Sequence, residues 1–423
     1  MSKPIIGNSE TFIAFRHLNF RRFIFSKFML TLALQIQFVV LSWQVYEITH
    51  DPLSLGFIGL AEAIPAVGLA LYGGYVSDRN DRRKILVWVQ GLMFLCTMLL
   101  TYVSYHFADL PIAQQSAFPF YMIMFGIGIL RGFYSPAQFP LMTQVVPREA
   151  YANSSAWNST FWHVAVVLGS SCGGLMLGFF GKNVSYITVL VIMFFGFLQI
   201  VRIPPQPVQE IKPGEKMMSS IREGLRFVFS NQAILGALSL DLIAVLFGGA
   251  TAMLPIFASD ILHVGEKGFG FLRAAPFAGS VLMALYMTRH PPLKNAGNKL
   301  LYCVAGFSVC MIAFALSRNF YLSLFILALS GAFDNVSVVI RSMIMQLLTP
   351  DHMRGRVSSV STMFISSSNE IGAFESGFAA KLLGLVPSVV IGGTIALGSV
   401  AAAGAALPEL RKLDLRERHH SKE

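Results

Sequence analysis

The sequence predicts an all-α integral membrane protein with twelve transmembrane helices in two pseudo-symmetric halves of six. Composition, the number of long apolar stretches and the distribution of basic residues all point to this fold class. Of the 423 residues, 54% are hydrophobic and only 13% are charged, and the mean hydropathy is +0.61. This balance is far from that of an ordinary soluble domain, in which about a quarter of the residues are charged.

Twelve apolar stretches are each long enough to cross a hydrocarbon core of about 30 Å as a helix. The first one is longer than the apolar part of a signal peptide, and no small-residue cleavage site follows it, so we expect it to be retained. The predicted spans begin near Phe23, Ser54, Ile85, Phe118, Ser155, Ser185, Gln232, Gly268, Lys299, Tyr321, Val357 and Pro387.

The basic residues predict the orientation, because Lys and Arg accumulate in cytoplasmic loops. With both termini in the cytoplasm, 24 of the 32 basic residues lie inside, four lie in outer loops and four lie within spans. This topology also accounts for the net charge of +10, so no nucleic-acid partner is implied. The four cysteines lie in spans at no metal-ligand spacing, so neither a disulfide framework nor a metal site is expected.

A weak internal repeat divides the chain. Pro147 and Pro350, Gly169 and Gly372, and Gly174 and Gly377 are each 203 residues apart, and a second set of matches around Gly56 and Gly270 has an offset of 214. Duplicated halves are typical of secondary transporters. We therefore expect an N-terminal half over residues 1–203, a cytoplasmic linker over 204–231, a C-terminal half over 232–408 and a basic cytoplasmic tail over 409–423.

The linker is the longest polar interruption. Its prolines favour an extended start, and its second part predicts a short amphipathic helix that lies at the membrane interface. The apolar side of this helix is formed by Ile221, Leu225, Val228 and Phe229.

Between the second and third spans lies a charged turn with two acids and four bases among small residues. Its pattern is a Gly, three residues, Asp-Arg, two residues and a basic pair, formed by Gly74, Asp78, Arg79, Arg82 and Arg83. This motif resembles the corresponding loop of the major facilitator superfamily. Further motifs resemble the bacterial branch that contains the enterobactin exporter and macrolide-efflux proteins; they are residues 19–22 (NFRR), 51–56 (DPLSLG), 220–224 (SIREG), 272–276 (LRAAP) and 354–357 (RGRV).

The resemblance implies that the charged turn is a gating motif, in which ion pairs form and break as the bundle changes state. The alternative is that its bases only set the topology. The resemblance also implies that the first, fourth, seventh and tenth spans line a central cavity, which points to Gln35, Gln37, Arg131, Asp334 and Asn335. Residues 169–174 (GSSCGG) resemble a fifth-span signature of drug exporters, with Ser170 in the place of its proline.

Ionisable residues within spans are costly in hydrocarbon and usually face a cavity or a partner. Asp241 and Arg341 lie at similar depths, roughly 10 Å from the cytoplasmic side, where they could pair across the central cavity. A carboxylate that moves toward low dielectric takes up a proton more readily. We therefore interpret Glu62, Asp241, Asp334 and Glu370 as candidate proton carriers; the alternative for each is a fixed interhelical ion pair or hydrogen bond.

These observations lead to the hypothesis of a proton-coupled exporter, an antiporter in the bacterial inner membrane. Its substrates would be amphipathic small molecules, such as siderophores or hydrophobic drugs, and it would work by alternating access. An uptake symporter for a nutrient or a lipid-like compound is the alternative. The chain has no phosphate-binding loop of the GxxxxGK[ST] type and no HExxH or GxSxG motif, so we expect no enzyme activity and no cofactor. The expected partners are the substrate, protons or another coupling ion, and membrane lipid, and the expected working unit is a monomer.

Overall fold

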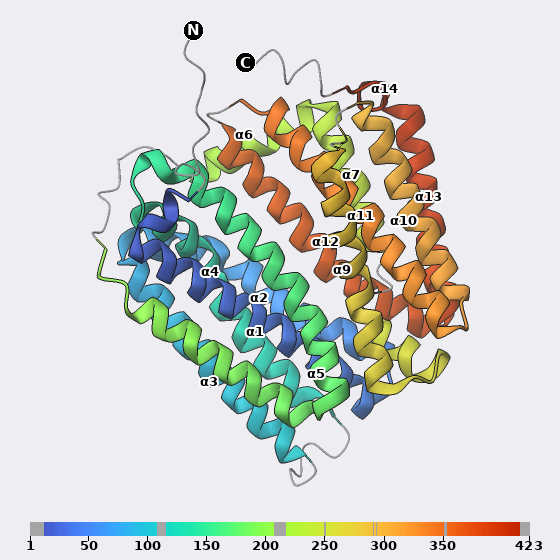
Figure 1. Cartoon of the computed structure of the whole chain (residues 1–423), viewed down its shortest axis with the longest axis horizontal. Helices are drawn as coiled ribbons and strands as arrows, with labels where there is room; N and C mark the ends of the chain where they lie inside the picture. The colour runs from blue at the N-terminus through green and yellow to red at the C-terminus, as the bar shows by residue number, and fades with distance from the viewer. Residues whose placement is uncertain are drawn as a thin grey trace. The chain divides into compact units, whose positions relative to one another are not determined.

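The computed structural model describes residues 12–107, 116–206, 217–248, 251–290, 292, 294–350 and 353–414. Within them the chain forms helices and no strand (Figure 1). The helices of the N-terminal part are α1 (Leu18–Thr49), α2 (Pro52–Arg79), α3 (Arg82–Tyr105), α4 (Phe118–Gln144) and α5 (Tyr151–Val201). Those that follow are α6 (Met217–Ser230), α7 (Gln232–Phe247), α8 (Leu254–Ile256), α9 (Gly265–Arg289), α10 (Ala296–Leu316), α11 (Phe320–Leu348), α12 (Arg354–Leu383), α13 (Leu385–Ala406) and α14 (Pro408–Arg411).

Nine helices in the described residues are long and apolar enough to cross a membrane, and the bent pair Arg222–Ser230 and Gln232–Phe247 is a possible tenth. Each of the twelve predicted stretches falls on a helix, but α5 carries two of them. Its 51 residues are broken at Gly181, whose φ of 76° belongs to a region that favours glycine. The seventh stretch is also interrupted, because α7 ends at Phe247 and a short π-helix, Phe257–Ile261, precedes α9.

Side-chain caps place the starts of α3 and α7. Asn231 Oδ1 accepts the backbone N–H groups of Ala233 and Ile234 at 3.1 Å each, at the start of α7. Asp81 caps α3 through the N–H of Arg83 at 2.9 Å. Because the first turn of a helix leaves N–H groups without intrahelical partners, such caps fix where a span begins.

The chain forms two compact units. The first comprises Met1–Thr49 and Ala61–Ile211, and the second His50–Leu60 and Lys212–Glu423. The division therefore passes through α2, whose first turns belong to the second unit. There Asp51 forms an ion pair with Lys381 of α12 at 2.8 Å, and the backbone of Gly56 lies against that of Phe374.

Corresponding helices of the two units begin at the offsets found in the sequence. Leu18 and Gln232 start α1 and α7, 214 residues apart, and Tyr151 and Arg354 start α5 and α12, 203 residues apart.

Close helix contacts recur at the same offsets. A Cβ added at Gly128 of α4 would overlap the carbonyl oxygen of Glu62 in α2, and a Cβ at Gly331 of α11 would overlap that of Pro276 in α9. Gly169 of α5 packs on Leu32 of α1, just as Gly372 of α12 packs on Leu246 of α7. Small residues are what permit such close approach of helices in a membrane.

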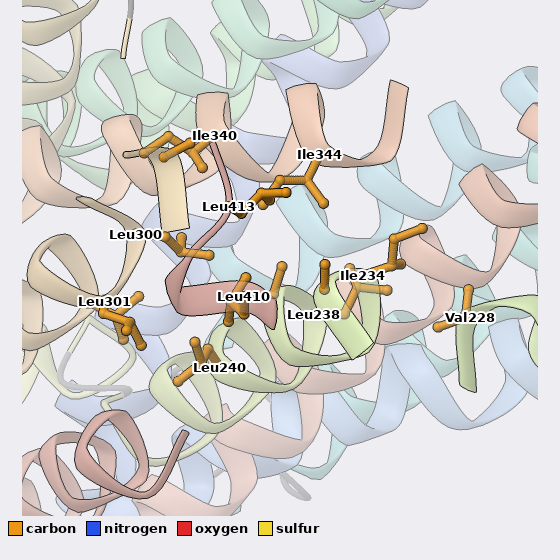
Figure 2. Packing of buried hydrophobic residues seen from close by; sticks show 14 of the residues in the cluster. Val228, Ile234, Leu238, Leu240, Leu300, Leu301, Ile340, Ile344, Leu410 and Leu413 are labelled. Atoms are coloured by element: carbon orange, nitrogen blue, oxygen red, sulfur yellow. The ribbon is translucent and has the colours of Figure 1, made fainter. Parts of the chain in front are cut away.

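The second unit has a buried core that joins α6, α7, α10, α11 and α14. Figure 2 shows Val228, Ile234, Leu238, Leu300 and Ile344 within it. Val228 of α6 is completely buried, whereas Phe229 is 59% exposed. The predicted apolar side of α6 is thus divided between this core and the surface. The side chain of Ile221, also predicted on that side, lies outside the described residues.

The spans expose large apolar side chains on their outer surfaces. Trp88, Leu282, Tyr302 and Tyr321 are each at least 69% exposed. Exposure on this scale would be unfavourable in water, but it suits helices surrounded by lipid, where Trp and Tyr favour the interfacial depth.

The close approach of α2 and α4 should make Gly128 intolerant of a side chain. We expect Gly128→Ala to lower the thermal unfolding temperature of the detergent-purified protein by several degrees, because overpacking costs about 1–3 kcal/mol. Gly68→Ala is the matched control in the same helix pair, because its Cβ would have no neighbour within 4 Å. Equal unfolding temperatures for both variants would contradict the close contact.

Candidate transport pathway

Polar residues of α1 bond to α3 at regular intervals. Ser26 donates to Gln90 Oε1 at 3.1 Å, Thr97 donates to Gln37 Oε1 at 2.8 Å, and Ser104 donates to Gln44 Oε1 at 3.0 Å. The three α3 residues are seven positions apart, a spacing that returns to the same helix face every two turns. All six side chains are buried, so these bonds fix how α1 is rotated against α3.

Gln37 belongs to this contact and is only 1% exposed. The expectation that Gln37 lines an open cavity is therefore not what the structure shows. Gln35, on another side of α1, is half-buried and accepts a hydrogen bond from Ser170 of α5 at 3.2 Å.

The helices α1 and α5 lie side by side (Figure 1) and are packed through small residues and polar pairs. A Cβ added at Gly169 of α5 would lie only 2.8 Å from the Leu32 carbonyl oxygen of α1, so the two backbones approach closely. Nearer the start of both helices, Lys27 Nζ donates to Asn158 Oδ1 at 2.8 Å. Neither Lys27 nor Asn158 was among the predicted pathway residues, although Lys27 is one of only four basic residues in predicted spans.

Glu62 and Arg131 form an ion pair between α2 and α4. The Glu62 side chain is 8% exposed and that of Arg131 is 44% exposed, so a buried carboxylate meets a cation that reaches the surface of the unit. The adjacent contact of Gly128 with the Glu62 backbone sets the separation of the two helices. Sequence reasoning selected both residues but did not pair them.

Asp241 of α7 and Arg341 of α11 form a second ion pair, in which both side chains are about nine-tenths buried. Leu240 and Ile340, their immediate neighbours in sequence, belong to the hydrophobic core of the second unit (Figure 2). The pair that the sequence suggested is therefore present, and it lies within one unit. A buried pair of this kind needs good geometry, because the cost of desolvation is several kcal/mol per ion.

Asp334 lies close enough to Asp241 and Arg341 to interact electrostatically with both. Asp334 and Asn335 are half-buried on α11, and Asn335 Oδ1 has no hydrogen-bond partner among the described residues. The side chain of Glu370 lies outside the described residues.

In the charged turn, each arginine has a partner within the first unit. Arg82 pairs with Asp78 at 3.4 Å, and the Arg79 guanidinium lies 4.1 Å from the centre of the Tyr75 ring. Arg83 donates to the carbonyl oxygen of Val201 at 2.5 Å, at the end of α5. The last carbonyls of a helix lack intrahelical partners and carry partial negative charge, so Arg83 caps α5 in addition to any role in gating.

Gly74, the first residue of the motif, is buried near the end of α2. Its neighbour Gly73 allows the backbones of α2 and α4 to touch, because a Cβ there would overlap the carbonyl oxygen of Gly132.

Within the described part of the chain, no three His, Cys, Asp or Glu residues lie where they could hold a metal ion. The polar groups between these spans instead form charge pairs and amide hydrogen bonds, which suit passage of a solute or a proton through the bilayer. Long apolar helices with such pairs between them define a multi-pass membrane transporter.

The chain belongs to the transmembrane secretion effector family, whose model matches residues 9–423. It is thus a transporter of the major facilitator type.

Named relatives and solved structures agree with this class. The enterobactin exporter EntS of Escherichia coli O1:K1 / APEC is 23% identical over 384 residues, which cover 89% of each chain. A D-xylose–proton symporter has a similar structure, with a TM-score of 0.68 at 13% identity, over 94% of this chain and 99% of that one. A POT family transporter in complex with 5-aminolevulinic acid also has a TM-score of 0.68, at 13% identity, over 93% and 97% of the two chains. At these identities the solved structures indicate the fold alone.

A double-mutant cycle tests the Asp241–Arg341 pair. We expect Asp241→Asn and Arg341→Gln each to lower the free energy of unfolding by about 3–5 kcal/mol, because each leaves an uncompensated buried charge. The double variant should lose less than the sum of the two single losses, since neither charge then remains alone. The measurement is denaturant unfolding in detergent micelles, and additive losses would show that the two side chains do not interact.

Proposed function

We propose that the protein is a proton-coupled exporter of amphipathic small molecules that works by alternating access. The buried Asp241–Arg341 pair carries this proposal. Protonation of the carboxylate would remove the attraction that holds α7 to α11, and substrate binding could in turn favour release of the proton. Protonation of Glu62 would weaken the Glu62–Arg131 pair between α2 and α4 in the same way.

Export is supported by the family description, by the name of the enterobactin exporter relative, and by the small residues 169–174 of α5. Siderophores and hydrophobic drugs are the substrate classes that we propose, with the bacterial inner membrane as location. The uptake symporter remains the second candidate, because the D-xylose–proton symporter has a similar fold. The direction of flux in inverted vesicles separates the two.

Duplication of a six-helix unit fits the recurring helix starts and the paired glycine contacts. On this view the chain has twelve spans, with halves over residues 1–203 and 232–408, and α5 counts as two spans. We further propose that both termini are cytoplasmic, that residues 409–423 form a basic tail, and that the monomer is the working unit. Residues 415–423 lie outside the described part of the chain.

Substrate-induced proton movement in proteoliposomes tests the function. The screen covers catecholate and hydroxamate siderophores, macrolides and cationic dyes, with the parent, Asp241→Asn and Glu62→Gln side by side. We expect proton release with one chemical class, and loss of at least nine-tenths of this release in the variant that removes the proton carrier, with substrate binding retained. Substrate flux without any proton response would overturn proton antiport.

The charged turn is proposed to gate the pathway. Asp78→Ala and Arg82→Ala should each reduce turnover several-fold without loss of the protein from the membrane, because each breaks the 3.4 Å pair at the end of α2. Arg83→Ala is the comparison variant, and it should lower thermal stability because it uncaps α5. Initial transport rates, normalised to membrane-inserted protein, provide the measurement; normal rates in both Asp78 and Arg82 variants would leave only a topological role.

A further inference from the structure

Lys27 is a buried cation without a carboxylate partner in the part of the chain that the structure describes. Its side chain is 8% exposed, and its Nζ donates one hydrogen bond, to Asn158 Oδ1 at 2.8 Å. No ion pair joins Lys27 to an acidic side chain in the described ranges. An ammonium group has three donors, and its burial without a counter-charge costs several kcal/mol. Arg131 and Arg341, by contrast, each face a carboxylate.

The internal repeat shows what is missing near Lys27. At an offset of 214, Lys27 corresponds to Asp241, and at an offset of 203, Gln138 corresponds to Arg341. The second unit therefore has an ion pair where the first has a lysine and a neutral amide. Gln138 Oε1 is itself buried and has no hydrogen-bond partner among the residues described. In the first unit, Lys27 thus lacks a counter-charge and Gln138 Oε1 lacks a hydrogen-bond donor among the described residues.

Aromatic residues lie close in sequence to Lys27 on α1 and to Asn158 on α5. Trp157 precedes Asn158 on α5, and its ring lies 5.9 Å from that of Phe161. Phe161 in turn lies 5.6 Å from Phe28, the residue after Lys27 on α1. Trp157 and Phe161 also pack on Phe15, but Trp157, Phe161 and Phe28 are only partly buried, so each keeps some apolar surface for a ligand.

We propose that Lys27 and Asn158 form an anion-binding subsite for the transported molecule. The subsite would accept an acidic group, such as a carboxylate or a phenolate, carried on an aromatic body. The oxyanion would supply the missing counter-charge to Nζ, the Asn158 amide would donate to it, and the aromatic body would pack on Trp157, Phe161 and Phe28. This inference rests on the proposed transport function and narrows its substrates to amphipathic anions.

Two fluorescent probes that differ only in charge test the subsite. Dansylglycine carries a carboxylate, and dansylglycine amide is its neutral counterpart. Both are titrated into the full-length protein in detergent, with the parent, Lys27→Met, Lys27→Arg and Asn158→Asp. Lys412→Met is the matched control, because Lys412 is exposed. The readout is the ratio of the two dissociation constants.

We expect the parent, Lys27→Arg and Lys412→Met to bind the anion at least about tenfold more tightly than the amide. Lys27→Met should bind both probes equally. Asn158→Asp should also lose the preference, because its carboxylate would occupy the amine, and it should raise the thermal stability by neutralising a buried charge. This variant keeps the test valid if Lys27→Met fails to fold.

If Lys27 only bridges α1 and α5, Asn158→Asp would still stabilise the protein, but the parent would show no preference for the anion. That result, including absence of binding to both probes, would overturn the subsite. A preference that persists in Lys27→Met or Asn158→Asp would overturn it as well and would indicate that the anion binds elsewhere. The same titrations are made with the protein in vesicles that contain or lack anionic lipid. Weaker binding of the anionic probe in the anionic vesicles would show that lipid phosphate competes for the site.

Failure of the subsite is distinguishable from failure of the exporter hypothesis. Proton-coupled flux of a cationic dye that persists in Lys27→Met, together with no charge preference in the parent, would leave export in place and remove the subsite. Anion-selective binding without flux of any screened compound would leave the subsite in place and remove the exporter hypothesis.

Discussion

Polar groups between spans need partners inside the protein, because the hydrocarbon region of a bilayer offers none, and this requirement organises the whole bundle. Three amide and hydroxyl pairs set the rotation of α1 against α3, and two ion pairs join α2 to α4 and α7 to α11. At the α2–α4 contact, glycines also bring the two backbones close together beside the Glu62–Arg131 pair. Packing and polarity therefore act together, since small residues set the separation and polar residues set the register.

Equivalent helices pack through equivalent glycines in the two units, but the charged residues at equivalent positions differ. Gly128 and Gly331 approach the preceding helix in the same way, yet at equivalent positions Arg131 corresponds to Asp334, and Lys27 to Asp241. Duplication preserves the glycines because a side chain at either site would force the backbones apart. The ionisable positions can diverge more freely, because each needs only a partner of suitable charge. A repeated fold thus carries a different electrostatic environment in each half.

Much of the architecture follows from the sequence, whereas the partners of individual side chains do not. Apolar length placed the helices, and the offsets of the repeat match the starts of α1 and α7 and of α5 and α12. The break of the seventh stretch after Phe247 was not predicted, because most of its residues are apolar and periodicity does not reveal where such a helix stops. Glu62 and Arg131, 69 residues apart, were both selected, but pairing depends on the α2–α4 contact. Gln37 was misplaced because a glutamine in a span suits a cavity and a buried helix contact equally well.

The polar residues of α1 also have a consequence for how the protein enters the membrane. α1 is synthesised before α3 and α5, which supply the partners of Ser26, Lys27, Gln35, Gln37 and Gln44. Until those helices arrive, α1 holds a cation and several amides with no protein partner, an arrangement that lipid disfavours. Its release from the insertion machinery into lipid therefore becomes more favourable once α3 and α5 have been made, so the order of synthesis affects how the bundle assembles.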